Sequence, residues 1–294
     1  MSDQVRVLLG VSGHSHVDPR LAGLPCDAAG RHAFPAGWAL IEHPRHGRIL
    51  FDCGYGAPAR NAMRRGLRRV YRHLLGTCCP QEGDAVQLLL GRGIRADDID
   101  WVVISHFHPD HIGALREFPR ARFIAHRDAW ACVQRGPLAR LHSQIWRELL
   151  PGDIESRMRL LSPGAFRPLA GDLPALGGGV DLFDDGSIIA VDLPGHAHGQ
   201  IGLVTNHAGE RVVLVADAYW QKTQLAVPAP LSWLARRLAL HDTDAYAMTL
   251  HRLRPFRHAQ PDAWLIASHC AATLTEWSRC HPDAVLRAAG AGIR

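Results

Sequence analysis

The segment ISHFHPDHIGAL, Ile104–Leu115, places three histidines and an aspartate directly behind a run of strand-forming apolar residues, Trp101–Ser105. Pro109 cannot continue a strand, and its fixed φ suits the first turn of a helix. His106 and His108 are two residues apart, so they project to the same side of an extended chain. The segment therefore predicts that four metal-competent side chains converge where a buried strand ends: His106, His108, Asp110 and His111.

Three further residues of the same kinds follow apolar strands later in the chain. Ser187–Asp192 leads to His196 in a glycine-flanked turn, Arg211–Ala216 leads to Asp217, and Trp264–Ser268 leads to His269. Any one of them alone is typical of a turn or cap, but the repeated placement favours a shared site. Imidazole and carboxylate ligands without sulfur suit zinc, and also iron, manganese or cobalt. We expect a divalent metal centre, with Zn2+ as the first choice.

Length and composition exclude several classes of protein. The chain has 294 residues, of which 47% are hydrophobic, which is enough for one large core. No secretory signal or run of 18 apolar residues is seen, so we expect a cytoplasmic protein with no transmembrane segment. Seven scattered cysteines without C-x-x-C spacing argue against a disulfide framework. A net charge of +5 is modest, and no nucleic-acid partner is expected.

Short strands alternate with helices along the whole chain, and no linker or repeat divides it, so residues 1–294 are expected to form a single domain. Strands are predicted at Val5–Gly10, Trp38–Glu42, Arg48–Phe51, Trp101–Ser105, Arg122–Ala125, Ser187–Asp192, Gly202–Thr205, Arg211–Ala216 and Trp264–Ala267. Helices are predicted at Asp84–Leu90, Arg127–Gln134, Leu231–Leu240 and Asp244–Leu253. Strands that arrive in two groups favour two sheets packed on each other, with helices outside.

The chain resembles the metallo-β-lactamase superfamily in five segments that follow the family's order: FDCGYG at Phe51–Gly56, SHFHPDHIG at Ser105–Gly113, LPGHAHGQ at Leu193–Gln200, VADAY at Val215–Tyr219 and ASH at Ala267–His269. The resemblance implies an αββα sandwich of two mixed β-sheets, with helices on the outer faces and two divalent metal ions between the sheets. It further implies that one ion is held by His106, His108 and His196, the second by Asp110, His111 and His269, and both by Asp217.

Within that superfamily the chain is most similar to the acyl-homoserine-lactone lactonases, through GWALIEHPRHGRILFDCGY and GIRADDIDWVVISHFHPDHIG. This resemblance implies metal-dependent hydrolysis of a small acyl ester, first a lactone with a quorum-quenching role. The alternatives are an acyl thioesterase similar to glyoxalase II and, with less support, a phosphodiesterase, an RNA-processing nuclease or a non-catalytic binding protein. Those lactonases carry a tyrosine three residues after the bridging aspartate, where this chain has Trp220. We expect Asp110 and Tyr219 to be catalytic residues, with the Tyr219 phenol donating to the developing oxyanion.

Two segments, 57–80 and 221–243, are predicted to act as lids, and a homodimer is an open possibility. Within the first, Arg60–Leu74 reads as an amphipathic helix with a basic stripe of Arg60, Arg64, Arg68 and Arg72 and an apolar stripe of Met63, Leu67, Val70 and Leu74. It is interpreted as an anion-attracting cap, a membrane-surface helix or a solvated surface helix. Within the second, the apolar face is formed by Leu231, Trp233, Leu234 and Leu238.

Three further residues receive weaker interpretations. Asp52 is similar to the family's aspartate that orients a metal ligand, although a turn-forming carboxylate is an equal alternative. His14 and His16 are interpreted as a loop pair rather than as residues that line the entrance to the site.

Overall fold

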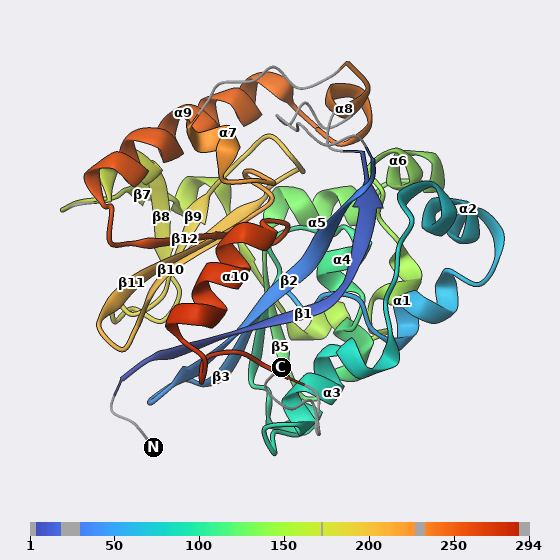
Figure 1. The fold of residues 1–294 in the computed structure, drawn as a ribbon, viewed down its shortest axis with the longest axis horizontal. Helices are drawn as coiled ribbons and strands as arrows, with labels where there is room; N and C mark the ends of the chain where they lie inside the picture. Colours follow the sequence, from blue (N-terminus) through green and yellow to red (C-terminus); the bar gives the residue numbers. More distant parts are fainter. Residues whose placement is uncertain (1–3, 19–29, 172, 227–232, 288–294) are drawn as a thin grey trace.

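Two six-stranded sheets lie face to face with helices on their outer sides in the computed structural model, which describes residues 4–18, 30–171, 173–226 and 233–287 (Figure 1). The first sheet has the spatial order β1 (Arg6–Val17), β2 (His32–His43), β3 (Gly47–Phe51), β4 (Trp101–Val103), β5 (Arg122–His126) and β6 (Met158–Leu161). Strands β1 to β3 pair antiparallel, and β3 to β6 pair parallel. The predicted αββα sandwich of mixed sheets is confirmed.

The second sheet has the spatial order β12 (Trp264–Ala267), β11 (Glu210–Ala216), β10 (Ile201–His207), β9 (Ile189–Asp192), β8 (Gly178–Asp181) and β7 (Arg167–Pro168). Its pairs are antiparallel except for β11 and β12, which run parallel. Two parallel neighbours end at the same edge of the sheet. The residues that follow β11 and β12 are therefore brought to one place.

The core has three layers because both faces of each sheet are covered. Between the sheets, side chains such as Ile49, Val103 and Ile124 meet Leu203 and Leu214. A second cluster lies under the helices of the first sheet, and a third lies under those of the second sheet. Burial on both faces explains why the central strands are almost continuously apolar in sequence.

The helices occupy the outer faces and the rim around the strand ends. They are α1 (Ala57–Ala62), α2 (Gly66–Leu75), α3 (Ala85–Leu90), α4 (Pro109–Ile112), α5 (Arg127–Val133), α6 (Pro137–His142), α7 (Thr223–Ala226), α8 (Trp233–Leu238), α9 (Thr243–Ala259) and α10 (Ala271–Cys280). Across the described residues, no helix combines the length and the apolar character needed to span a bilayer.

All nine predicted strands are present, but β6, β7 and β8 escaped prediction because they are short and carry little apolar alternation. The prediction of one continuous helix over Arg60–Leu74 is wrong. Gly66 has a left-handed φ of 55°, so the chain breaks into α1 and α2 at this residue. Of the predicted 231–240 helix, α8 is described and Trp233 on it is exposed, whereas Leu231 and the side chains of Leu234 and Leu238 lie outside the described part.

Candidate metal centre

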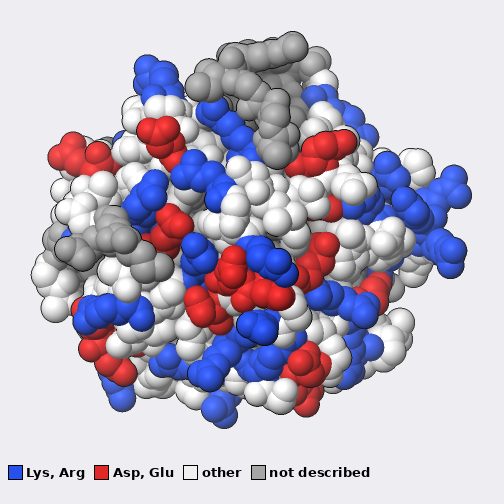
Figure 2. Space-filling view, turned by 90° about the horizontal axis from the view of Figure 1, so that it is seen from below, with Lys and Arg blue, Asp and Glu red and all other residues white. Residues whose placement is uncertain are grey.

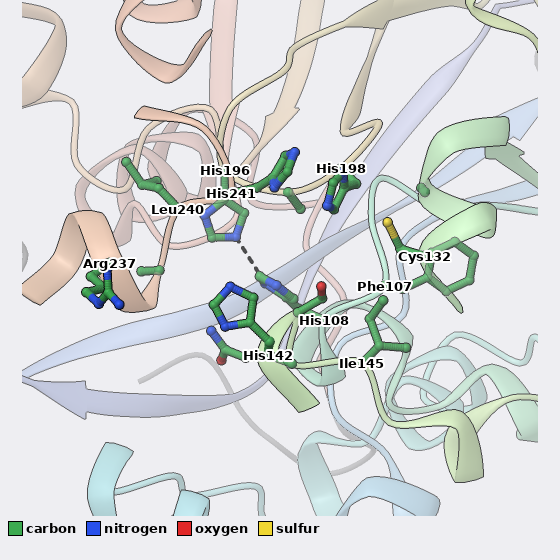
Figure 3. A pocket seen from close by; sticks show the side chains of 15 residues that line it. Phe107, His108, Cys132, His142, Ile145, His196, His198, Arg237, Leu240 and His241 are labelled. Carbon is green, nitrogen blue, oxygen red and sulfur yellow. Dashed lines mark hydrogen bonds between the residues drawn. The ribbon is translucent and has the colours of Figure 1, made fainter. Parts of the chain in front are cut away.

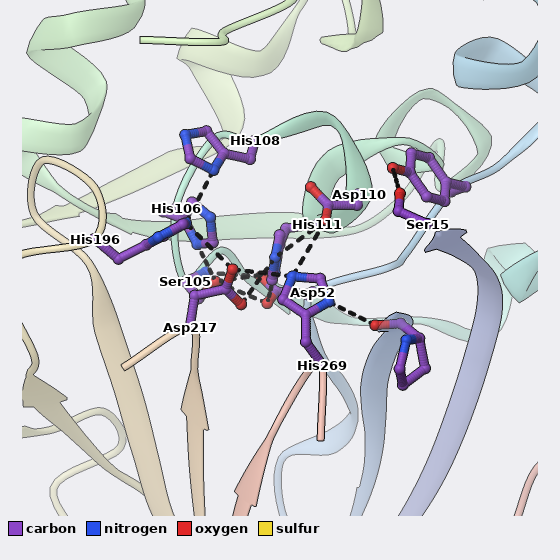
Figure 4. A network of polar contacts seen from close by, with 12 residues as sticks. Ser15, Asp52, Ser105, His106, His108, Asp110, His111, His196, Asp217 and His269 are labelled. Carbon is purple, nitrogen blue, oxygen red and sulfur yellow. Dashed lines mark hydrogen bonds and ion pairs between the residues drawn. The ribbon is translucent and has the colours of Figure 1, made fainter. Parts of the chain in front are cut away.

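Seven side chains from four strand ends converge at one edge of the sandwich (Figure 4). The first sheet contributes the loop after β4 and the first turn of α4, and the second sheet contributes the segments that follow β9, β11 and β12. We call this group the His/Asp cluster: His106, His108, Asp110, His111, His196, Asp217 and His269. All seven residues that the sequence predicted as ligands are thus brought together.

Within the cluster, potential ligand atoms fall into three sets whose members lie within 4.8 Å of one another. The sets are His106 with His108 and His196, His106 with His111 and Asp217, and Asp110 with His111 and His269. The first and third sets match the two groups that the family resemblance implied.

Asp217 lies at the centre of the cluster. One carboxylate oxygen is 3.3 Å from His111 Nε2, and the other is 3.2 Å from His196 Nε2 and 3.0 Å from His269 Nε2. Asp110 approaches the same ring nitrogen, with Oδ2 3.4 Å from His269 Nε2. Since His196 belongs to the first set and His269 to the third, the Asp217 carboxylate is placed between them, as a bridging ligand requires.

Three histidines are oriented by hydrogen bonds on the ring nitrogen that faces away from the cluster. His111 Nδ1 donates to Asp52 Oδ2 at 2.7 Å, and His269 Nδ1 donates to the Pro35 carbonyl at 2.6 Å, because neither acceptor can donate. Ser105 Oγ donates to Asp52 Oδ2 at 2.7 Å, so it accepts from His106 Nδ1 at 2.9 Å. In its neutral form each of these rings therefore keeps an Nε2 lone pair directed into the cluster.

The buried polar atoms of the cluster fit a bound cation. In the described structure, His106 Nε2, His111 Nε2 and Asp217 Oδ1 are fully buried and have no hydrogen-bond partner. A buried polar atom without a partner costs about 1–3 kcal/mol, so three such atoms facing one point need a common ligand. Their nitrogen and oxygen donors match the preference of divalent metals such as Zn2+.

The electrostatic environment points the same way. Burial lowers the pKa of His108 to about 4 and that of His196 to about 3, so both imidazoles are neutral and able to bind metal near neutral pH. Burial opposes charge on Asp217 as well, but the imidazoles of His269, His111 and His196 hold its pKa well below the usual range. Burial also opposes charge on His111 and His269, but the nearby carboxylates, Asp217 above all, raise the pKa of both rings. The centre therefore combines an ionised carboxylate with neutral imidazoles at His108 and His196, and a metal that binds His111 and His269 displaces their protons.

A cavity of about 510 Å³ opens directly onto the cluster. At its base lie His108, Asp110, His196, Asp217 and His269. Its walls are mostly apolar or aromatic and come from β1 and β2, α2, α6 and the segment after β11: Val17, Phe34, Tyr71, Leu74, Leu75, Leu141 and Trp220. Such a site can bind an apolar chain while it holds a polar group against the cluster.

A smaller cavity of about 50 Å³ adjoins the first and shares His108 and His196 with it (Figure 3). His198 lies here, with its ring against that of His241 at a centroid distance of 3.2 Å. His198 is thus beside the cluster and outside all three ligand sets.

The structure does not bring Tyr219 to the cluster, so its predicted catalytic role is withdrawn. The Tyr219 hydroxyl donates to the Leu265 carbonyl at 2.6 Å, and the ring packs under α9 beside Leu253 and Phe256. The neighbouring Trp220 instead lines the cavity, with its ring centroid 5.9 Å from that of His196. Asp110, the other predicted catalytic residue, faces the cavity.

The structure also places the other residues and segments that the sequence singled out. Asp52 is completely buried and accepts from the Ser105 backbone at 2.8 Å as well as from its hydroxyl, so its predicted position behind the metal loop is confirmed. His14 and His16 belong to β1 rather than to a loop, and Ser15 between them lines the cavity. Both predicted lid segments contribute to the cavity walls, and their movement stays a prediction.

Three contributors were missed from sequence: Ser105, the Pro35 carbonyl and Tyr71. Ser105 directly precedes His106, so its position in the motif was a usable signal. A backbone carbonyl leaves no mark in the sequence. Tyr71 is contributed by α2, far from the motifs along the chain, and only the fold brings it to the cavity.

Comparison with known proteins also relates this chain to metal-dependent hydrolases. Residues 35–257 match the sequence model of the metallo-beta-lactamase superfamily. The chain is 32% identical over 171 residues to N-acyl homoserine lactonase AiiB of Agrobacterium fabrum, an alignment that covers 57% of this chain and only 56% of that protein. It is 28% identical over 247 residues to the probable metallo-hydrolase Rv2300c of Mycobacterium tuberculosis, covering 78% of this chain and 73% of that one.

Among solved structures, an N-acyl homoserine lactone hydrolase with the product N-hexanoyl-L-homoserine at its catalytic metal center has a TM-score of 0.69. The match covers 94% of this chain and 97% of that one at 17% sequence identity. At this level of identity the likeness establishes the fold.

Proposed function

The chain belongs to the metallo-beta-lactamase superfamily, and from that premise we propose that it is a dinuclear metal-dependent hydrolase of lactones that carry an acyl chain. The observation that carries the proposal is the apolar cavity that opens onto the His/Asp cluster. An acyl chain fits its walls, and the ester carbonyl then lies against the polar base. The lactonase names of the relatives support the same substrate class.

The cluster residues would hold two divalent ions, for which Zn2+ is the first choice. His106, His108 and His196 would bind one ion, Asp110, His111 and His269 the other, and Asp217 both. When bound, such ions lower the pKa of water toward about 7 and polarise a carbonyl oxygen. Ser105, Asp52 and the Pro35 carbonyl keep the imidazoles in the tautomer that binds metal.

Ring opening requires a proton on the leaving alkoxide as the carbonyl carbon gains a hydroxyl from water. We assign this proton transfer to Asp110, whose side chain borders the cavity beside His269. The balance is complete, since water supplies both the hydroxyl and the proton. The products are a free alcohol and a carboxylic acid on one molecule, and the acid then ionises to a carboxylate and releases a proton to solvent.

Tyr71 takes the place in the proposal that sequence assigned to Tyr219. Its phenol lines the same cavity as Asp110 and Asp217, and its ring rests edge-on against Trp146 at a centroid distance of 4.9 Å. Burial raises the pKa of Tyr71 well above its ordinary value, so the hydroxyl keeps its proton at neutral pH. A neutral phenol held in this way is suited to donate to the substrate carbonyl oxygen.

A thioesterase that acts on a phosphate-bearing carrier would need cations beside the cavity, and the arginines of segment 57–80, interpreted from sequence as an anion-attracting cap, are the candidates. Arg60 is paired with Asp84, and Arg68 is paired with Glu148 at 2.9 Å. In the described structure no arginine of α2 borders the cavity, whereas Arg237 of α8 does. These contacts favour a lactone over a phosphate-bearing thioester as the substrate. As from the sequence, we expect a cytoplasmic enzyme.

The proposal is tested by offering the purified protein N-acyl homoserine lactones, acyl-CoA thioesters and a phosphodiester, and by following proton or thiol release. We expect lactone turnover that increases from a short to a long acyl chain, because each added CH2 buried in the cavity contributes about 0.8 kcal/mol. The variant Asp217→Ala is the control and should lose activity. If the protein hydrolyses the thioester or the phosphodiester but not the lactone, the proposed substrate class is wrong.

A further inference from the structure

Helix α2 carries an apolar stripe that is largely exposed. The stripe consists of Leu67, Val70 and Leu74, which recur at i, i+3 and i+7 and are 64%, 51% and 70% exposed. The helix packs on the protein through a different stripe, in which Tyr71 contacts Trp146 and Arg68 lies over the same ring. The exposed stripe is thus additional to the one that holds the helix in place.

The apolar surface continues onto the neighbouring helix α6 (Figure 1). Leu138 and Leu141 are exposed and share a shallow groove with Leu67. We call these five residues the α2–α6 face: Leu67, Val70, Leu74, Leu138 and Leu141. Leu74 and Leu141 also line the cavity over the His/Asp cluster. The face therefore extends from the outer surface to the cavity wall, because Leu74 and Leu141 belong to both.

Positive charge surrounds this face. Segment 57–80 contains six arginines and no aspartate or glutamate. Arg60 and Arg68 have acidic partners, whereas Arg65, Arg69 and Arg72 are exposed and form no ion pair within the described ranges. Figure 2 shows basic side chains gathered at the right-hand edge of the molecule, the edge that α2 occupies in Figure 1, and the basic residues of α2 are arginines. The partner of the face must therefore accept apolar side chains and be negatively charged.

We propose that the α2–α6 face docks on the surface of an anionic phospholipid bilayer. A short helix with exposed leucines on one side and arginines on the other is suited to lie in the interface, with the leucines among the acyl chains and the arginines at the headgroups. A symmetric contact with a second copy is disfavoured, because an isologous interface built on this face would bring two arginine-rich helices together.

Docking in this orientation places the cavity mouth at the membrane surface. An amphiphilic acyl lactone that partitions into the bilayer would then reach the His/Asp cluster along Leu74 and Leu141. This second step rests on the proposed function, whereas the docking itself does not.

The test is sedimentation of the full-length wild-type protein with vesicles of phosphatidylcholine alone or mixed with phosphatidylglycerol, at low and physiological salt. We expect binding to the mixed vesicles only, and weaker binding at the higher salt. Arg65→Gln with Arg69→Gln should weaken binding by about fivefold per arginine. Leu67→Ser with Val70→Ser should weaken it by about tenfold or more.

The matched controls are Leu90→Ser with Met248→Ser for exposed apolar residues, and Arg95→Gln with Arg279→Gln for exposed arginines elsewhere. These should bind vesicles as the wild type does. The proposal is overturned if mixed vesicles do not bind the wild type, or if the controls lose as much binding as the α2 variants. It is also overturned if light scattering shows a dimer that Leu67→Ser with Val70→Ser converts to a monomer.

Vesicle binding needs no turnover, so the two proposals fail separately. A protein that binds anionic vesicles and leaves every lactone intact would retain the docking face and lose the proposed substrate. A lactonase with no affinity for vesicles would show the reverse.

Discussion

At the scale of single residues, Asp52 orients two histidines of the cluster although it does not line the cavity. One carboxylate accepts from Ser105 twice and from His111 once, and through the Ser105 hydroxyl it also fixes His106. Asp52 has a left-handed φ of 60°, a conformation that aspartate and asparagine tolerate better than most residues. One buried side chain thus determines the tautomer of two imidazoles.

The first prediction is that Asp52→Asn keeps the fold and weakens metal binding by about 10–100-fold. The asparagine fits the backbone conformation, but its amide group presents hydrogens to donors that need an acceptor. Chelator competition on the purified variant measures the affinity. Asp153→Asn, which alters an exposed aspartate paired with Arg157, is the control. Equal affinities for Asp52→Asn and the wild type would remove the orienting role.

The second prediction separates two tyrosines. Tyr71→Phe should lower turnover by about 100–1,000-fold, the effect of removing one donor to a developing oxyanion, with little change in metal content. Tyr219→Phe should leave turnover nearly unchanged and cost about 1 kcal/mol of stability, because it removes the hydrogen bond to the Leu265 carbonyl. Steady-state kinetics and thermal unfolding of both variants distinguish the two roles. A large loss of turnover in Tyr219→Phe, with none in Tyr71→Phe, would restore Tyr219 as the catalytic tyrosine.

The misassigned tyrosine shows what sequence alone does not resolve at this scale. Side-chain direction alternates along a strand, but Ala216 has a φ of 48° and the Ala218 amide bonds back to the Val215 carbonyl. The chain turns there, so alternation no longer predicts whether residue 219 or 220 faces the cavity. The seven predicted ligands were readable because each lies in the segment just after an apolar strand or in the first turn of a helix.

At the scale of elements, the position of the cluster depends on the strand ends and on the loop that carries His196. The loop that carries His196 is tied to the N-terminal end of α9, since the Gly195 carbonyl accepts from the amides of His241 and Asp242. Gly195 has a φ of 128°, and a Cβ at this position would lie 2.2 Å from the Tyr246 backbone nitrogen. Only glycine permits this approach.

The third prediction follows from that contact. Gly195→Ala should displace His196 and lower both the melting temperature and the metal content. Gly93→Ala is the matched control, because Gly93 also has a positive φ but has open space around it, so only backbone strain of about 1 kcal/mol is added. Metal analysis and calorimetry of both variants test this. If neither variant loses metal, the loop can accommodate a Cβ at residue 195 without displacing His196.

The same scale shows why helices were harder to predict than strands. The central strands are apolar runs with clear ends, whereas Arg60–Leu74 has a helical period that continues through Gly66. Periodicity does not reveal that Gly66 takes a left-handed φ, and the packed stripe of α2 was hidden beside a more apolar stripe that remains exposed. The part of the cavity wall that α2 contributes was therefore beyond sequence.

At the scale of the whole molecule, the cluster joins the two halves of the sandwich. His106, His108, Asp110 and His111 extend from the first sheet, whereas His196, Asp217 and His269 extend from the second. Ions held by both sets would link the sheets, and metal binding would contribute to the free energy of unfolding.

The fourth prediction is that removing metal with a chelator lowers the melting temperature by about 10 °C. Saturation at about 1,000 times Kd stabilises by about 4 kcal/mol, and each kcal/mol shifts a domain of this size by about 2–4 °C. Asp217→Ala should show a much smaller difference with and without chelator. Identical melting of the wild-type protein in both conditions would contradict a link between the sheets.

The most direct test of the central claim is the metal content of the purified protein, measured by mass spectrometry of the elements against protein concentration. The arrangement of the seven side chains predicts about two divalent ions per chain, and about one or fewer in Asp217→Ala, because this carboxylate serves both positions. A single tightly held ion in the wild type, together with an Asp217→Ala variant that retains the same content and full hydrolytic activity, would contradict the dinuclear account.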